Sequence, residues 1–213
     1  MKPIIPALIL SSCLALSAAP ADARIWTATE TGDYYELVYP VFECDDPDIK
    51  EAINADIYTL ASEVADGNDG EAYTTSFHYR LKMENDRYLS LVFLPGGYPK
   101  GAIHGMYTGI GVVYDKTTGE KLPLSYFADV TLDDLIRLWE DGELYHYEGR
   151  KIDVIPLFGP PKRVPEDYFL TDDGKIFVTF GPYELGPYAQ GITAINVTSL
   201  KKPGVFSGYH SNR

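Results

Sequence analysis

Apolar residues recur at steps of three and four between residues 46 and 65, which is the period of a helix with one buried face. Asp46 is the predicted N-cap, and Pro47 suits the first helical position. The apolar stripe consists of Ile49, Ile53, Ile57, Leu60 and Val64. Turn formers over residues 66–70 end this helix, so we expect it to lay its stripe on a sheet.

Other stretches combine β-branched and aromatic residues in the manner of strands. The predicted strands cover residues 34–43, 73–83, 88–94, 104–114, 166–170, 175–180 and 192–198. Residues 84–87 join two of them as a hairpin, and polar turns are expected at 115–121 and 172–174. Pro40 favours an edge position or a bulge for the first strand.

A second, shorter helix is predicted from Thr131 to about Glu140, because Thr131 and Asp134 have the spacing of a capping box. Residues 122–127 form a short apolar run, and residues 141–163 show no clear period. Hairpin-forming strands with two helices predict an α+β fold. It should contain antiparallel sheets, one long amphipathic helix after the first strand, and the second shorter helix.

The N-terminal segment has the pattern of a signal peptide over residues 1–23, with a basic start, an apolar run and small residues before the expected cleavage after Ala23. Residues 10–13 also fit a lipobox, which would place a lipid on Cys13. We expect a mobile lead-in over residues 24–33, the domain over 34–200, and a loose tail over 201–213. If the domain has two lobes, the Pro-Gly loop at 95–101 is the expected boundary.

The formal net charge is −13. It stays −13 after removal of residues 1–23, which contain one cation, Lys2, and one acid, Asp22. Such a charge disfavours nucleic acid and anionic lipid as partners and attracts basic proteins, although it also serves solubility alone. Cys44 would be the only cysteine left, so no intramolecular disulfide is expected, and it is interpreted as a buried or half-buried core filler.

Residues 181–191, Gly-Pro-Tyr-Glu-Leu-Gly-Pro-Tyr-Ala-Gln-Gly, lie between two predicted strands. Proline restricts φ in this connection, and glycine permits turns that other residues resist. A stiff loop of this kind would hold Tyr183 and Tyr188 in fixed positions, where tyrosine is well suited to recognition. The alternative interpretation is that both rings plug the end of the core.

The chain lacks the local motifs of metal, phosphate and serine-nucleophile chemistry, so we expect no metal, no cofactor and no catalytic residue. The four histidines are scattered singly. His104 would either face a cleft or orient its loop through a backbone hydrogen bond. Carboxylates are abundant, and a catalytic pair of them would make the chain a small cell-wall hydrolase.

Four segments together resemble the extracytoplasmic domain of RsiV-type anti-sigma factors, which also accompanies peptidoglycan deacetylases. They are Ile53-Asn-Ala-Asp-Ile57, which follows Tyr39-Pro40, then Gly101-Ala-Ile-His-Gly105, residues 114–122 with Phe127 after them, and residues 181–191. The resemblance implies an α+β fold and an extracytoplasmic binding role, and the anti-sigma member binds lysozyme. The family usually has Gly-Gly-Ala-His, whereas Ile103 intervenes here. We expect a free-standing sensor module without a sigma-binding segment, retained anchor or deacetylase domain.

The sequence therefore predicts an exported, periplasmic or secreted, non-catalytic binding module. Its ligand would be a basic lysozyme-type muramidase or cell-wall glycan (peptidoglycan), with membrane association only if Cys13 carries lipid. The alternatives are the carboxylate-dependent hydrolase and a structural component of the envelope. The candidate ligand-binding residues, which lie in the 181–191 connection and the Pro95–Gly105 loop, are Tyr183, Glu184, Pro187, Tyr188, Tyr98 and His104.

Overall fold

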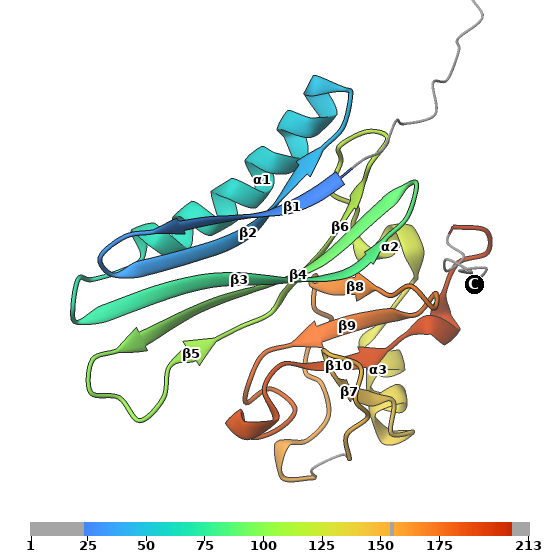
Figure 1. The fold of residues 1–213 in the computed structure, drawn as a ribbon. Helices are drawn as coiled ribbons and strands as arrows, with labels where there is room; N and C mark the ends of the chain where they lie inside the picture. The colour runs from blue at the N-terminus through green and yellow to red at the C-terminus, as the bar shows by residue number, and fades with distance from the viewer. Residues whose placement is uncertain (1–23, 154–155, 206–213) are drawn as a thin grey trace, which may run out of the picture.

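The computed structural model describes residues 24–153 and 156–205 as two sheets with three α-helices (Figure 1). The larger sheet has six strands in the order β1-β2-β3-β4-β5, and β6 also pairs with β4. Its strands are β1 (Arg24–Thr31), β2 (Tyr35–Glu43), β3 (Tyr73–Glu84), β4 (Tyr88–Pro99), β5 (Met106–Tyr107) and β6 (Ile110–Asp115). The predicted α+β fold is confirmed.

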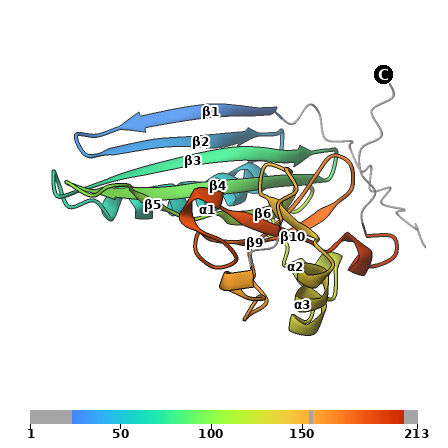
Figure 2. The ribbon, with the colours of Figure 1, turned by 90° about the horizontal axis from the view of Figure 1, so that it is seen from below.

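The smaller sheet has four strands in the order β7-β10-β9-β8, all antiparallel. Its strands are β7 (Leu144–His146), β8 (Tyr168–Leu170), β9 (Ile176–Phe180) and β10 (Thr193–Asn196). The helices are α1 (Pro47–Asp66), α2 (Leu124–Phe127) and α3 (Leu132–Glu140), with 3-10 turns η1 (Pro156–Phe158), η2 (Tyr188–Gln190) and η3 (Thr198–Leu200). Figure 2 shows β1 to β4 side by side, with the second sheet and α3 beyond β4.

The N-terminal residues 24–31 form a strand, so the prediction of a mobile lead-in over residues 24–33 is wrong. β1 pairs with β2 along its whole length, from Arg24 opposite Glu43 to Thr31 opposite Glu36. This edge strand buries little side-chain surface, and Trp26 is 53% exposed. Backbone pairing, which a hydrophobic pattern does not report, therefore orders the segment. Because β1 precedes β2, the long helix follows the second strand rather than the first. Pro40 pairs with Thr27 of β1, but β2 pairs with β3 only over residues 35–37. At Pro40 the described sheet therefore has a partner strand on one side only, in agreement with the predicted edge position.

Helix α1 begins as predicted, because the Asp46 carboxylate accepts hydrogen bonds from the N–H groups of Asp48 and Ile49. It connects two strands that pair in parallel, β2 with β3 over residues 35–37 and 75–77. A parallel pair requires such a crossover, so the sheet is mixed rather than purely antiparallel. The helix buries Ile53 and Ile57 against β2, β3 and β4. Just before it, Cys44 is half-buried.

Strands β3 and β4 form the predicted hairpin, but both extend beyond the predicted bounds. Residues 95–99 belong to β4, which pairs with β3 as far as Tyr73 opposite Pro99. The predicted loop over 95–101 is therefore wrong for these five positions, and the larger sheet continues through them to Asp115. The predicted strand over 104–114 is divided into β5 and β6. The change from one sheet to the other falls in residues 116–143.

The second sheet is covered on both faces. On one face Leu170, Ile176 and Val178 pack with α2 and α3, and Trp139 of α3 is 9% exposed there. On the other face Phe169 and Phe177 pack with Val92 of β4. Helix α3 has the predicted capping box of Thr131 and Asp134. The predicted signal peptide at 1–23 and residues 206–213 of the predicted tail lie outside the described residues. At its start the tail is not loose, because the Lys202 N–H donates to the Phe127 carbonyl at 2.8 Å and the Lys202 side chain pairs with Asp129.

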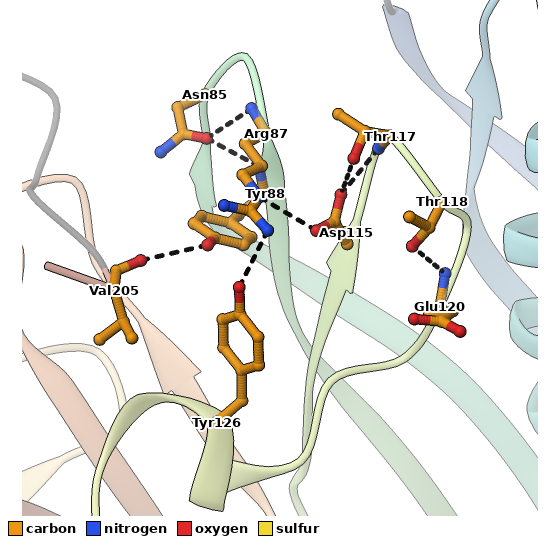
Figure 3. A network of polar contacts seen from close by, with 9 residues as sticks. All are labelled: Asn85, Arg87, Tyr88, Asp115, Thr117, Thr118, Glu120, Tyr126 and Val205. Carbon is orange, nitrogen blue, oxygen red and sulfur yellow. Dashed lines mark hydrogen bonds and ion pairs between the residues drawn. The ribbon is translucent and has the colours of Figure 1, made fainter. Parts of the chain in front are cut away.

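A polar network closes the turn that follows β6 (Figure 3). The side chain of Asp115, 4% exposed, accepts hydrogen bonds from the Thr117 backbone N–H at 2.8 Å and hydroxyl at 2.5 Å. Arg87 donates to the same carboxylate at 3.1 Å and to the Tyr126 hydroxyl of α2 at 2.9 Å. Burial opposes ionisation of Asp115, but these bonds outweigh it and hold the pKa of Asp115 below its usual value. The network ties the β3–β4 turn, β6 and α2 together.

Replacing Asp115 tests this network. We expect Asp115→Asn to lower the free energy of unfolding at pH 7 by about 1–3 kcal/mol, because the ion pair with Arg87 is lost. Since the native pKa is depressed, the carboxylate stabilises the fold above the unfolded pKa of about 4, and this contribution disappears as the pH falls through the native pKa. Urea unfolding at a series of pH values should therefore show a difference between wild type and variant that shrinks on acidification.

The matched control is Asp45→Asn, which removes an exposed carboxylate outside the network. It should change the free energy of unfolding by less than about 0.5 kcal/mol. A difference between wild type and Asp115→Asn that stays constant from pH 7 to pH 3 would contradict the assigned role of the charge.

Candidate functional site

The structure brings together the two loops that contain the candidate residues. The connection between β9 and β10 lies against the segment between β4 and β5. The rings of His104 and Tyr188 stack, with centroids 4.0 Å apart and planes inclined by 22°. The Tyr188 hydroxyl donates to the carbonyl oxygen of Gly105 at 2.7 Å. A hydrogen bond thus joins residues 83 positions apart in the chain, and a ring contact joins Tyr188 to the residue before that carbonyl.

Three further tyrosines complete a cluster that we call the aromatic patch. Its residues are Tyr98, His104, Tyr107, Tyr183 and Tyr188. The ring of Tyr188 lies 5.5 Å from that of Tyr107 and 5.8 Å from that of Tyr183. The hydroxyl of Tyr98 donates to the Ala102 carbonyl at 2.6 Å, which fixes the ring beside the loop. Burial, and secondarily Tyr188, raises the pKa of Tyr107.

The patch is displayed rather than buried. Tyr183 is 50% exposed and Tyr98 45% exposed, and His104 is exposed as well. Ile103 and Met106, which lie within two residues of His104, add exposed apolar surface. Leu185, not a tyrosine, fills the core at the base of the loop. Of the two rings that the core-plug interpretation concerned, Tyr183 points outward and Tyr188 is half-buried as its support.

The backbone of the β9–β10 connection is strained at Tyr183. Its φ of 70° lies in the left-handed region, and it is the one non-glycine residue with positive φ in the described part of the chain. Such a conformation costs a residue with a side chain about 1 kcal/mol or more and persists only where its surroundings hold it. Pro187 precedes the short turn η2 and leads directly into Tyr188. The loop therefore presents its rings in a fixed arrangement.

Glu184 is engaged within the protein. Its two carboxylate oxygens accept hydrogen bonds from Arg163 Nε at 3.1 Å and Nη2 at 3.2 Å. The backbone N–H of Gly181 donates to the same carboxylate at 2.6 Å. A bidentate pair of this kind fixes geometry as well as adding energy. Glu184 thus fixes the turn that contains Tyr183, because its carboxylate binds the backbone at Gly181 and the side chain of Arg163.

His104 has no carboxylate or nucleophile partner among the described contacts. Its Nδ1 lies 2.9 Å from the carbonyl oxygen of Gly105, and its ring covers Tyr188. A histidine that bonds a neighbouring carbonyl orients its loop, which agrees with the second of the two interpretations of this residue. Its exposed ring face still belongs to the patch.

Sequence reasoning missed Tyr107 and Arg163. Tyr107 lies in a two-residue strand that the pattern merged with β6, and Arg163 lies in the stretch without a clear period. The spacing of charges alone does not reveal a pair 21 residues apart such as Arg163 and Glu184. Asp167, near this pair, is a half-buried carboxylate whose pKa is raised mainly by burial.

In the part of the chain that the structure describes, no group of three or more His, Cys, Asp and Glu side chains is arranged to hold a metal ion. Nor does any described helix have the length and apolar character needed to cross a membrane.

Comparison with known proteins gives one family match over part of the chain and a similar fold in two solved structures. Residues 132–199 match the family model DUF3298, a protein of unknown function. The whole fold resembles that of a DUF3298 family protein from Pseudomonas aeruginosa PAO1, with a TM-score of 0.59, 12% identity, and coverage of 90% of this chain and 100% of that one. A DUF3298 family member from Bacteroides fragilis gives a TM-score of 0.53 and 15% identity, over 84% and 91%. Comparison with curated proteins gives no match.

The left-handed backbone at residue 183 generates a stability prediction. We expect Tyr183→Gly to be more stable than Tyr183→Ala by about 1 kcal/mol, because only glycine adopts positive φ without a steric penalty. Both variants lose the ring, so their difference reports the backbone alone. Urea unfolding at pH 7 measures it. Equal stability of the two variants would mean that residue 183 does not have this conformation in solution.

Proposed function

We propose that this protein is an exported, non-catalytic binding module whose recognition surface is the aromatic patch. The observation that carries the proposal is the stacking of His104 on Tyr188, which joins two distant loops into one surface with exposed tyrosines on both sides. Tyrosine rings offer large contact area with few rotatable bonds, so little side-chain entropy is lost on binding.

The loop is preorganised for this role. Arg163, Glu184 and the Gly181 N–H hold it closed, and the Gly105 carbonyl holds Tyr188. A ligand that meets rings already in place does not bear the cost of ordering them. Exposed apolar side chains at Ile103 and Met106 extend the surface, which is the composition typical of the centre of a protein interface.

The partner we propose first is a basic muramidase of the lysozyme type. Support comes from the resemblance of residues 34–200 to the extracytoplasmic domain of RsiV-type anti-sigma factors and from the net charge of −13, which attracts a cationic protein. Cell-wall glycan is the second ligand. Sugar rings also pack on exposed tyrosine faces, and a wall ligand fits the proposed export directed by residues 1–23.

The proposal can be tested with a chain that lacks residues 1–23, which is titrated with a basic lysozyme. We expect saturable binding by calorimetry, weakened but still present at moderate salt, because charge assists association while the rings supply most of the affinity. Tyr183→Gly and Tyr98→Ala should each raise the Kd at least about tenfold, the cost of a ring at the centre of an interface. Residual muramidase activity, measured in parallel, shows whether binding inhibits the enzyme.

The matched control is Tyr58→Ala, which removes a ring that is 47% exposed on α1, outside the patch. Its Kd should equal that of the wild type. If Tyr58→Ala weakens binding as much as Tyr183→Gly does, the patch is not the recognition surface. If lysozyme fails to bind at all, titration with soluble wall fragments decides for the second ligand, and release of reducing ends from them would instead identify a hydrolase.

A further inference from the structure

A cavity lies outside the aromatic patch. It has a volume of about 710 Å³ and opens between β6, the segment that contains α2, and the segment that precedes β8. Its lining is mostly apolar and shares no residue with the patch. It comprises Gly111, Val112, Lys121, Leu122, Pro123, Leu124, Ser125, Ala128, Asp129, Val130, Thr131, Val164, Pro165, Glu166 and Tyr168. Both the volume and the lining are typical of sites for small molecules.

The walls of this cavity are rigid. Tyr168, 2% exposed, donates its hydroxyl to the Leu122 carbonyl at 2.8 Å and so joins the two sides. The backbone on the first side is held as well, because the Leu122 N–H donates to the Val113 carbonyl at 2.8 Å. Pro123 and Pro165 restrict the chain on opposite walls. The cavity is therefore part of the folded structure.

The charges around the cavity indicate which ligand charge it favours. Two lysines reach this region, and both are paired: Lys202 Nζ lies 2.8 Å from Asp129, and Lys121 Nζ lies 3.8 Å from Asp56. Glu166 is exposed at the rim, and among the described residues no cation or hydrogen-bond donor contacts its carboxylate. Among the residues that line the cavity, the cation Lys121 is thus paired, whereas the carboxylate of Glu166 has no described partner, so the charge that the lining offers a ligand is negative.

One ammonium group of the protein already binds to residues that line this cavity. The ammonium group of Lys202 is held by the Asp129 carboxylate and, at 2.6 Å, by the Ser125 carbonyl oxygen. Asp129 and Ser125 both line the cavity. A primary ammonium is a compact charge with three donors, which matches an arrangement of separate oxygen acceptors.

From this geometry we propose that the cavity binds a small molecule with an aliphatic chain and a terminal primary ammonium group. The chain lies on Leu122, Leu124 and Val130, and the ammonium group pairs with Glu166 at the rim. This site is independent of the aromatic patch and of the ligand proposed for it.

Calorimetric titration with three probes of equal chain length tests the proposal: n-octylamine, n-octanol and octanoate, each below its micelle concentration at pH 7. We expect the amine to bind at least about tenfold more tightly than the alcohol, the range of a charge-assisted hydrogen bond, and octanoate to bind weakest. Glu166→Gln should remove the advantage of the amine and leave the affinity for octanol unchanged. Glu51→Gln, an exposed glutamate on α1, is the charge-matched control and should change neither.

Val164→Trp provides a second, steric variant, because residue 164 is 38% exposed at the mouth of the cavity. It should abolish binding of all three probes while lysozyme titration stays as in the wild type.

Equal affinity for amine and alcohol in the wild type would overturn the proposed charge selection, and failure of every probe would overturn the site. Binding of a lysine-containing peptide in the absence of amine binding would replace the small molecule by a protein partner and would also overturn the proposal.

Discussion

The contact between β6 and β8 is the constraint on which the arrangement of the two sheets depends. A Cβ atom on Gly111 would lie 2.4 Å from the backbone oxygen of Tyr168, so only glycine permits this approach. With β8 held there, Ser90 of β4 accepts the N–H of Leu170, and β4 is buried on both faces. The connection after β9 then meets the segment between β4 and β5, where Tyr188 contacts His104 and Gly105. The aromatic patch exists because two strands that are close at one end direct their loops to the same side.

Local patterns predicted the elements that rest on local physics. The Asp46 cap, the Thr131 capping box and the β3–β4 hairpin follow from side chains within a few residues of one another, and all three are confirmed. Residues 24–31 escaped prediction because an edge strand with both faces largely exposed needs no apolar alternation. The parallel pairing of β2 with β3 escaped as well, since it covers three residues on each strand and depends on the crossover helix.

In the candidate site, too, the local features were predicted and the contacts between distant segments were not. The restrictive residues of 181–191 identified a stiff loop, and its two tyrosines lie as a pair at its surface. Sequence alone did not show that His104 stacks on Tyr188, because that contact requires both sheets to be assembled. It also assigned Glu184 to a ligand, whereas Arg163 occupies its carboxylate. No sequence pattern indicated the cavity beside Glu166, because its walls come from three separate segments of the chain. The hydrogen bond from Tyr168 to Leu122 joins two of these segments.

The positions of the two tryptophans have a consequence for spectroscopy. Trp26 lies half in solvent on the outermost strand of the larger sheet, and Trp139 is buried where α3 covers the smaller one. Indole emission depends on the polarity around the ring, so the two residues should emit at different wavelengths and respond to different quenchers. Each sheet therefore has one tryptophan whose fluorescence reports on its surroundings. Loosening of one sheet while the other stays folded would be visible in a single fluorescence spectrum, without any label.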